Sequence, residues 1–276
     1  MHLNRRRFIG AISAGASAAV SASHLRASDK PAAAFTLGLG TYTFRNQDMA
    51  GLIERCRDLN LRTIELSHPQ FMLPQADLST FATVRQELLA GGVDLRSWFC
   101  GDLTKPSDVD RMREGAHLFG VKMVSGSATH ELLDAVDAAC TKGGFRFGIH
   151  NHYFANRKFL YESPEDVLRA LNGRTNLFST FDTGHMIACG FDPTKAYEEL
   201  KAHIRIIHLK DEDAPGHGVV LGKGKGGMAR FLRTISQDQF SGLAAIEYEE
   251  GTDPTKEVAQ CIAVIRDQVS LEASKV

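Results

Sequence analysis

The stretch NLFSTFDTGH, residues 176–185, decides the fold of this chain. It is a short apolar run that ends in Asp182, with His185 three residues later. The same arrangement, an apolar run followed by side chains of the metal-ligand type, occurs in three more places. These are FRFGIHNH (145–152), IRIIHLKD (204–211) and LAAIEYE (243–249). The pattern therefore indicates four strands that each carry ligand-type residues at their C-terminal ends.

The spacing of these residues indicates how the four strands are connected. The steps from His150 to Asp182, from there to His208 and from there to Glu247 are 32, 26 and 39 residues, which suits one strand plus one helix each time. In a barrel of parallel strands the C-terminal strand ends meet at one mouth. The sequence therefore predicts that His150, Asp182, His208 and Glu247 converge on one point and bind one divalent metal ion.

Apolar runs and amphipathic stretches alternate eight times along the chain. The strand-like segments are 35–42, 61–66, 93–100, 121–125, 145–150, 177–182, 204–208 and 243–247. The helix-like segments are 49–59, 78–89, 109–118, 131–140, 164–171, 193–202, 228–235 and 257–269. Eight such units predict a single (β/α)8 barrel over residues 29–276. A doubly wound open sheet is the alternative, but it would not bring four strand ends to one point.

The N-terminal segment differs in composition from the rest. Residues 1–28 contain four arginines and no acidic residue, and Arg5, Arg6 and Arg7 precede a weakly apolar stretch rich in Ala, Ser and Gly. This segment resembles a twin-arginine export signal, which implies a folded protein exported to the periplasm, and it is too short to span a membrane. A disordered basic tail is the alternative.

Composition restricts the class of partner. Without residues 1–28 the chain has 28 basic and 33 acidic residues, a net charge of −5, which argues against nucleic-acid binding. Five dispersed cysteines without a CxxC motif indicate packing residues rather than a disulfide framework. A homo-oligomer is compatible with the sequence.

Residues two apart share one face of a strand, which adds candidates at the mouth. By this rule His152 lies beside His150, Lys210 beside His208, and Glu249 beside Glu247. A lysine that points into a barrel needs an anion or a polar substrate, because burial of an unpaired charge is costly. Glu249 could equally be a solvated loop residue.

Three residues near earlier strands are candidate substrate contacts. Glu65 ends the second strand and could reach a substrate hydroxyl, support a metal ligand, or pair with Arg62 or Arg96. His68 could line the pocket. Trp98 could stack on a sugar ring, although a lone Trp is more often a packing residue.

The glycine-rich stretch 222–227, GKGKGG, matches G-x-G-x-x-G, but no strand directly precedes it as the dinucleotide fingerprint requires. It closes a long loop, 212–220, after the seventh strand, where barrels often bind phosphate. We expect a flexible lid or an anion-binding loop with Lys223 as a substrate contact. A solvated basic loop would have the same sequence.

Together, DTGH (182–185), HLKD (208–211), LGKGKG (221–226) and IEYE (246–249) resemble motifs of the xylose isomerase-like TIM barrel superfamily. That group includes sugar-phosphate isomerases and epimerases, ketose 3-epimerases, inosose dehydratase and isomerase, and endonuclease IV. The resemblance covers about residues 35–270. It implies a TIM barrel in which Asp182, His208 and Glu247 bind metal and His185 contacts substrate. The chain departs from ketose 3-epimerases at His150, where those enzymes have a glutamate that also acts as an acid/base group.

The converging ligand-type residues and this resemblance together predict a divalent-metal-dependent sugar isomerase or epimerase, for which a small carbohydrate is the expected partner. One Mn²⁺, Co²⁺, Zn²⁺ or Mg²⁺ ion would polarise a carbonyl, and the mixed ligand set favours the first three. Glu247 or a histidine would remove the adjacent proton, and His152, His185 or Lys210 would act as acid or stabilise the developing charge.

Other functions are compatible with parts of the pattern. Without the strand-five glutamate, a lyase or dehydratase acting on a 3-keto-glycoside or keto-inositol is the main alternative. An endonuclease IV-like nuclease and a non-catalytic sugar-binding barrel are more remote, since the former needs a trinuclear zinc site with many more histidines.

Overall fold

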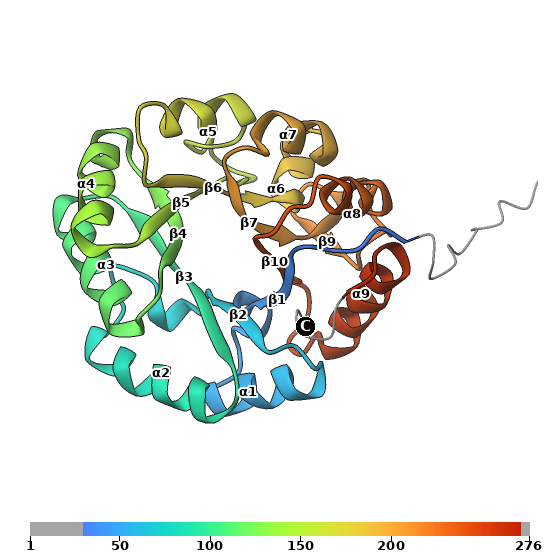
Figure 1. Cartoon of the computed structure of the whole chain (residues 1–276), viewed down its shortest axis with the longest axis horizontal. Coiled ribbons are helices and arrows are strands. Elements are labelled where there is room, and N and C mark those ends of the chain that lie inside the picture. Colours follow the sequence, from blue (N-terminus) through green and yellow to red (C-terminus); the bar gives the residue numbers. More distant parts are fainter. Residues whose placement is uncertain (1–29, 272–276) are drawn as a thin grey trace, which may run out of the picture.

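The computed structural model describes residues 30–271, and the predicted export signal lies outside them. Eight parallel strands form a closed barrel in the order β1-β10-β7-β6-β5-β4-β3-β2, and helices surround it (Figure 1). The strands are β1 (Thr36–Gly40), β2 (Thr63–Leu66), β3 (Asp94–Leu103), β4 (Met123–Ala128), β5 (Arg146–His150), β6 (Leu177–Asp182), β7 (Ile204–Leu209) and β10 (Leu243–Ile246). The predicted (β/α)8 barrel is confirmed.

One long helix follows each barrel strand. These helices are α1 (Met49–Asp58), α2 (Phe81–Ala90), α3 (Pro106–Phe119), α4 (Leu133–Gly143), α5 (Pro164–Leu171), α7 (Pro193–Leu200), α8 (Met228–Gln237) and α9 (Thr255–Gln268). Local sequence explains their limits: Ser163 and Asp166 form a capping box at α5, and Asp192 caps α7. Gly120 and Gly144 end α3 and α4 with φ of 68° and 66°, a conformation that favours glycine.

The register of the strands puts the ligand-type residues at one level. Asp182 pairs with His208 across β6 and β7, and His208 pairs with Ala245 of β10. On β5, Gly148 allows the strands to pack closely, because a Cβ atom there would lie 2.2 Å from Thr180 Oγ1. The barrel interior is therefore filled below the mouth, and the polar side chains gather at its C-terminal end.

Two short elements were not predicted. The helix α6 (Thr183–Ala188) starts directly after Asp182, so the DTGH motif is the junction of a strand and a helix. The strands β8 (Asp211–Ala214) and β9 (His217–Val219) form an antiparallel hairpin within the segment that was expected to be a loop.

The glycine-rich loop encloses an anion, but this anion belongs to the chain. The amides of Gly222, Gly224 and Gly226 donate to the carboxylate of Asp211 at 2.8, 3.0 and 3.0 Å. A Cβ atom at Gly224 would lie 2.4 Å from Asp211 Oδ1, so only glycine allows this approach. We expected a flexible lid, an anion-binding loop or a solvated basic loop; in the structure the amides of this loop are occupied by Asp211.

Two further properties concern the described residues as a whole. All five cysteines are free, and four of them are buried, as their spacing predicted. Within residues 30–271, no helix combines the length and the apolar character needed to cross a bilayer.

Candidate metal centre and substrate pocket

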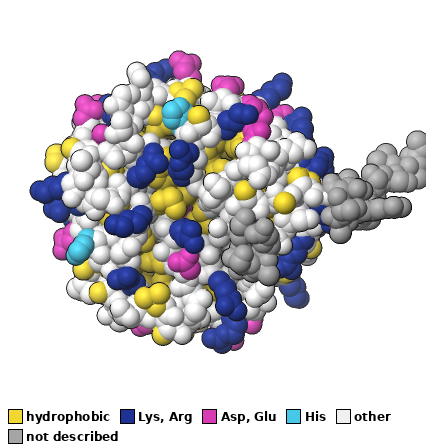
Figure 2. All heavy atoms as spheres, in the orientation of Figure 1, with side chains coloured by type: hydrophobic (Ala, Val, Ile, Leu, Met, Phe, Trp, Pro, Cys, Tyr) yellow, Lys and Arg dark blue, Asp and Glu magenta, His cyan; other side chains and the backbone are white. Residues whose placement is uncertain are grey.

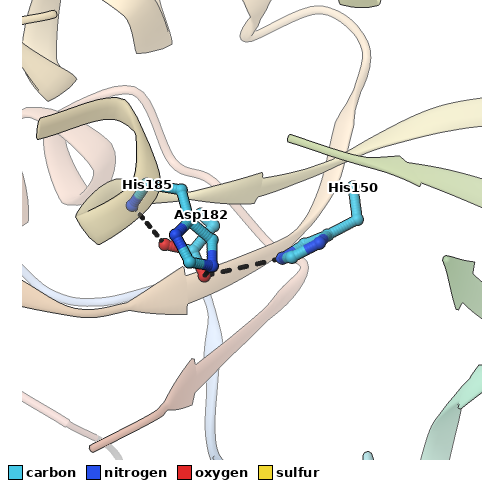
Figure 3. A group of neighbouring side chains, drawn as sticks. All are labelled: His150, Asp182 and His185. Atoms are coloured by element: carbon cyan, nitrogen blue, oxygen red, sulfur yellow. Dashed lines mark hydrogen bonds and ion pairs between the residues drawn. The ribbon is translucent and has the colours of Figure 1, made fainter. Parts of the chain in front are cut away.

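Asp182 lies at the middle of a group of nitrogen atoms. Its Oδ1 accepts a hydrogen bond from the His185 amide at 2.9 Å and so caps α6. Its Oδ2 lies 3.5 Å from His150 Nε2, 3.5 Å from His208 Nδ1, 3.7 Å from His185 Nε2 and 3.6 Å from Lys210 Nζ. Figure 3 shows the His150 and His185 rings approaching this carboxylate from β5 and α6. The structure therefore brings the predicted residues of three neighbouring strands together.

Each of the four predicted ligands has one buried polar atom that lacks a hydrogen-bond partner. His150 Nε2, Asp182 Oδ2, His208 Nδ1 and Glu247 Oε2 are all buried and have no hydrogen-bond partner. Glu247 Oε2 and His208 Nδ1 are 3.1 Å apart, but without hydrogen-bond geometry. Buried polar atoms normally have partners, and four such exceptions in one place call for a common explanation.

A divalent cation explains these atoms, because each can donate a lone pair to it. The ligand atoms of Asp182, His208 and Glu247 lie within 4.8 Å of one another, as do those of His150, Asp182 and His185. The donor set thus fits a metal ion of the kind predicted, and His185 is an additional candidate ligand.

Glu65 supports this arrangement from behind. One of its carboxylate oxygens is hydrogen-bonded to His208 Nε2, and the other accepts a bond from Ser97 Oγ at 2.5 Å. A proton on Nε2 leaves the lone pair of Nδ1 directed at the cluster, which is the usual role of a carboxylate behind a metal-bound histidine. Of the three roles open from sequence, Glu65 has the supporting one, while Arg96 pairs with Asp94.

Burial keeps three histidines of the site neutral. It lowers the pKa of His150, lowers that of His185 well below its usual value, and lowers that of His152 to about 3. Burial opposes ionisation of Asp182, but the nearby charge of Lys210 holds its pKa well below the usual range. His208 is the exception: burial opposes its charge, but Glu65 and Glu247 raise its pKa well above the usual value. The site therefore combines three neutral imidazoles with an ionised carboxylate, and a bound metal ion would displace a proton from His208.

Glu247 and Lys210 have shifted pKa values as well. Burial raises the pKa of Glu247 to about 7, against the opposing charges of His208 and Lys210. Burial disfavours the charged form of Lys210, but Asp182 and Glu249 more than compensate and raise its pKa. Lys210 Nζ is hydrogen-bonded to Glu249 and lies 3.4 Å from His185 Nε2.

A pocket of about 670 Å³ opens directly above the cluster. His150, His152, His185, His208, Glu247 and Glu249 form its polar end. The apolar part of its lining comprises Met72, Leu73, Pro74, Phe99, Phe154 and Phe159. The His152 ring lies 3.9 Å from that of His185 and is stacked on Phe154 at 4.2 Å between centroids. The predicted catalytic residues His152, His185 and Glu247 thus border this space, and Lys210 lies just behind it in an adjoining hollow.

The prediction that Trp98 contacts substrate is wrong. Its side chain is fully buried, packs on Phe81 and Phe119, and donates to the Phe71 carbonyl at 2.9 Å. On β3, Ser97 and Phe99 face the barrel interior, so Trp98 between them must face the helices.

His68 and Lys223 also lie away from the pocket. Both ring nitrogens of His68 are engaged by backbone, with Nε2 3.1 Å from the Gln47 carbonyl and Nδ1 accepting from the Gln70 amide at 3.4 Å. Lys223 is exposed and donates to Gln260 of α9 at 3.2 Å. Lys223 belongs to the glycine-rich loop that Asp211 holds. Neither His68 nor Lys223 is among the residues that line the pocket.

Asp102 is a pocket residue that we did not predict. It comes from the C-terminal end of β3, and its Oδ1 accepts a hydrogen bond from Ser127 of β4. The only signal in the sequence was a polar residue directly after a glycine. In the structure this glycine, Gly101, has a φ of 86°, which redirects the strand end.

Comparisons with known proteins agree with this geometry. The family model described as xylose isomerase-like TIM barrel matches residues 127–268. No significant match was found among curated proteins. Solved structures share the fold at low identity. The 3-keto-D-glucoside 4-epimerase YcjR from E. coli is 12% identical, with a TM-score of 0.69 and coverage of 84% of this chain and 99% of its own.

Two other solved structures are similar to the same extent. The probable 3-DHS dehydratase AsbF from Bacillus anthracis is 15% identical, with a TM-score of 0.66 and coverage of 84% and 99% of the two chains. The IOLI protein, described with a binding zinc atom, is 15% identical, with a TM-score of 0.67 and coverage of 86% and 100%. The family match over half of the chain, the closed barrel and the cluster at its C-terminal mouth lead to one conclusion: this protein belongs to the xylose isomerase-like TIM barrel family.

Proposed function

We propose that this protein is a metal-dependent enzyme that removes a proton from the carbon next to a carbonyl group of a sugar or keto-sugar, and thereby isomerises or epimerises it. The observation that carries the proposal is the set of four buried ligand atoms without partners at the base of the pocket. His150, Asp182, His208 and Glu247 would hold the ion, and Mn²⁺, Co²⁺ or Zn²⁺ suits this mixed donor set best. When bound, a divalent ion acts as a Lewis acid that polarises the substrate carbonyl.

The side chains around the ion would supply the proton transfers. Glu247 borders the pocket and would hold the ion through one oxygen while the other faces the substrate as general base. His152 also borders the pocket, and its Nδ1 has no partner in the described structure. Because its pKa of about 3 keeps the ring neutral, it would donate or accept a hydrogen bond at the substrate rather than act as the acid. Lys210 lies behind His185, where a hydrogen bond to Glu249 holds it, and would stabilise negative charge that develops on the substrate oxygen.

The lining of the pocket supports an unphosphorylated substrate. Among the described residues that line it there is no Lys or Arg, and Asp102, Glu247 and Glu249 are acidic. Lys210, in the adjoining hollow, already pairs with Asp182 and Glu249, and Arg157 lies over the Phe154 ring. A phosphate group would find no lysine or arginine in the lining, whereas Asp102 can accept a hydrogen bond from a sugar hydroxyl. The apolar part of the lining suits an apolar group attached to the sugar.

Elimination is the second candidate reaction, and His150 is the observation that favours it. A histidine at this position leaves Glu247 without an opposed glutamate, so a symmetric two-carboxylate proton relay is absent from the site. If the proton does not return to carbon and a β-substituent leaves instead, the enzyme is a lyase or dehydratase. The similar structures include a protein described as an epimerase and one described as a probable dehydratase.

The replacement Glu247→Gln tests the proposal. We expect the variant to retain part of its metal and to lose about 10² to 10⁴ in turnover, the usual contribution of a general base. Exchange of substrate C–H with solvent deuterium, followed by NMR over a panel of keto-sugars and 3-keto-glycosides, should fall by the same factor. The control is Glu165→Gln on the exposed face of α5, which should exchange like wild type. Exchange at the wild-type rate in Glu247→Gln would show that the base is another residue.

The same panel separates the two reactions. An isomerase or epimerase gives a product of unchanged mass that carries deuterium at carbon. A lyase gives a product lighter by the leaving group. No exchange and no product from any panel member, at full metal occupancy, would favour a sugar-binding protein without catalytic activity.

A further inference from the structure

A second hollow, also of about 670 Å³, lies at the opposite end of the barrel, where the strands begin. Its floor includes Met123 at the start of β4 and Leu243 at the start of β10. Its walls carry Arg96 of β3, Arg205 of β7 and Lys201, which follows α7. Figure 2 looks onto this end and shows Lys and Arg side chains around hydrophobic ones near the middle of the face. This surface is basic, whereas the chain as a whole is slightly acidic.

The cationic side chains of this hollow differ in whether an acidic residue pairs with them. Arg96 is paired with Asp94 at 2.8 Å, and Lys201 with Glu198 at 2.8 Å and Asp238 at 2.9 Å. In contrast, neither Arg205 nor its neighbour Arg146 at the start of β5 forms a salt bridge within residues 30–271.

Arg146 and Arg205 instead contact only backbone oxygens and rings. Arg205 donates through Nη1 to the Ala202 and Ile204 carbonyls at 3.2 and 2.6 Å. Arg146 reaches two carbonyls only at 3.5 Å through Nη2, and its guanidinium lies 5.8 Å above the Phe178 ring. Each guanidinium therefore retains N–H donors that no described residue accepts.

Proximity of the two charges is unfavourable in the free protein. Burial, and then the charge of Arg146, lower the pKa of Arg205. Phe178, above which Arg146 lies, belongs to the same apolar layer as Leu243, and Met123 packs against that layer. Arg205 lines the hollow itself, and Arg146 pairs with Met123 in the register of β4 and β5. An anion placed between them would relieve the repulsion and accept the free N–H groups.

We propose that this hollow, here called the basal site, binds a small organic anion that carries a phosphate or carboxylate group. The site comprises Arg96, Arg205, Met123 and Leu243 of the lining, together with Arg146, which is the register partner of Met123 at the edge of the hollow. Arginine suits this role because its planar fork binds both groups through two parallel hydrogen bonds. The apolar part of the ligand would lie on Met123 and Leu243, in agreement with the general design of small-molecule sites, which combine an apolar lining with a few polar groups.

The basal site is separate from the metal centre. Its residues lie at the starts of β3, β4, β5, β7 and β10, whereas the cluster lies at the ends of β5, β6, β7 and β10. The layer of Phe178, Ile206, Leu243 and Ala245 fills the barrel between them. Its ligand is therefore not the substrate of the proposed reaction, and the two proposals can fail independently.

Titration calorimetry of the full-length protein at low ionic strength tests this proposal. The ligands are phenyl phosphate, benzoate and inorganic phosphate. We expect phenyl phosphate to bind more tightly than inorganic phosphate because of the apolar floor. In Arg146→Gln and Arg205→Gln the affinity should fall at least tenfold. Arg169→Gln, on the exposed face of α5, is the matched control and should bind like wild type. Circular dichroism should show that each variant is folded.

Three results would overturn the proposal. The first is the absence of binding at millimolar phenyl phosphate. The second is equal affinity in wild type and in Arg146→Gln. This variant leaves the backbone contacts of Arg205 unchanged, so it tests the Arg146 guanidinium alone. The third is loss of binding in Asp182→Ala, because that would place the anion at the metal centre instead.

Discussion

Asp182 is the residue on which the site depends most, because its two oxygens have different functions. Oδ1 caps α6, and Oδ2 faces the imidazoles of His150, His185 and His208. An aspartate before Thr-Gly is often a turn or helix cap, and at a strand end of this barrel it is also a candidate metal ligand. In the structure Oδ1 accepts the capping bond and Oδ2 has no hydrogen-bond partner, so the two roles need not compete.

This division leads to a prediction about metal content. Asp182→Asn keeps an oxygen for the cap but replaces the ionised ligand, so it should lose most of its metal and change stability little. Asp182→Ala should lose metal and also about 1 kcal/mol of stability, the usual contribution of an N-cap. Elemental analysis and thermal unfolding measure both effects. Asp192→Asn, at the cap of α7, is the control and should keep its metal. Metal content equal to wild type in Asp182→Ala would exclude this residue as a ligand.

His152 gives a prediction about pH. Its usual pKa near 6.5 applies to the unfolded chain, whereas burial lowers its pKa to about 3 in the native protein. Between these values the unfolded state binds a proton that the native state does not, so native stability falls as the pH decreases from 6.5. Above pH 6.5 both states are neutral and this contribution vanishes. The loss is at most about 1.4 kcal/mol per pH unit.

Urea unfolding of metal-free protein at pH 7.5 and pH 5.5 measures this effect. We expect wild type to lose about 1 kcal/mol more than His152→Asn over this interval. His203→Asn, at an exposed position just before β7, should behave like wild type. The same pH dependence in wild type and His152→Asn would contradict the low pKa of this residue.

At the scale of elements, the segment after β7 is the least predictable part of the site. Its strands β8 and β9 are rich in acidic and glycine residues and lack the apolar alternation that reveals a strand from sequence. They pair because Asp211 holds the glycine-rich loop and Gly216 turns the chain with φ of 75°. Both causes are tertiary or conformational, so periodicity could not indicate them.

Removal of the Asp211 carboxylate should loosen this segment. In Asp211→Ala the amides of Gly222, Gly224 and Gly226 lose their acceptor, at about 1–3 kcal/mol for each amide that stays buried and unpaired. Hydrogen–deuterium exchange should therefore accelerate over 212–227 while the barrel strands keep their protection. Asp213→Ala serves as control, since Asp213 pairs only with exposed His217. Unchanged exchange in Asp211→Ala would show that the loop is held by other contacts.

On the scale of the whole molecule, the sequence predicted the barrel and the metal ligands for the same reason. Both depend on the repeat of strand and helix, which places His150, Asp182, His208 and Glu247 at equivalent positions. Residues outside this repeat were harder to place. Trp98 could have been excluded by alternation along its strand, but the backbone contacts of His68 and the outward course of Lys223 depend on neighbouring loops.

Export of the whole chain remains a prediction that rests on residues 1–28, outside the described structure. The five cysteines are free and the proposed ion would bind to folded protein, which suits a route that transports folded proteins. Replacement of Arg5, Arg6 and Arg7 by Lys keeps the charge but removes the arginine pair, so the protein should accumulate in the cytoplasm. Cell fractionation with immunoblotting measures this, with Arg26→Lys as control. Normal periplasmic accumulation of the triple variant would contradict a twin-arginine signal.

The Asp211 anchor has a consequence for how this barrel can diversify. The chain leaves the barrel at Asp211 and returns to the same carboxylate at Gly222, so the segment between them is a loop already closed at its base. Its hairpin contributes Gly216, Gly218 and Val219 to the hollow beside Lys210. The bond from Gly222 to Asp211 does not involve the side chains of the hairpin between them. The hairpin could therefore be replaced by a different segment, in evolution or by engineering. Such an exchange would alter what the mouth accepts and leave the metal ligands in place.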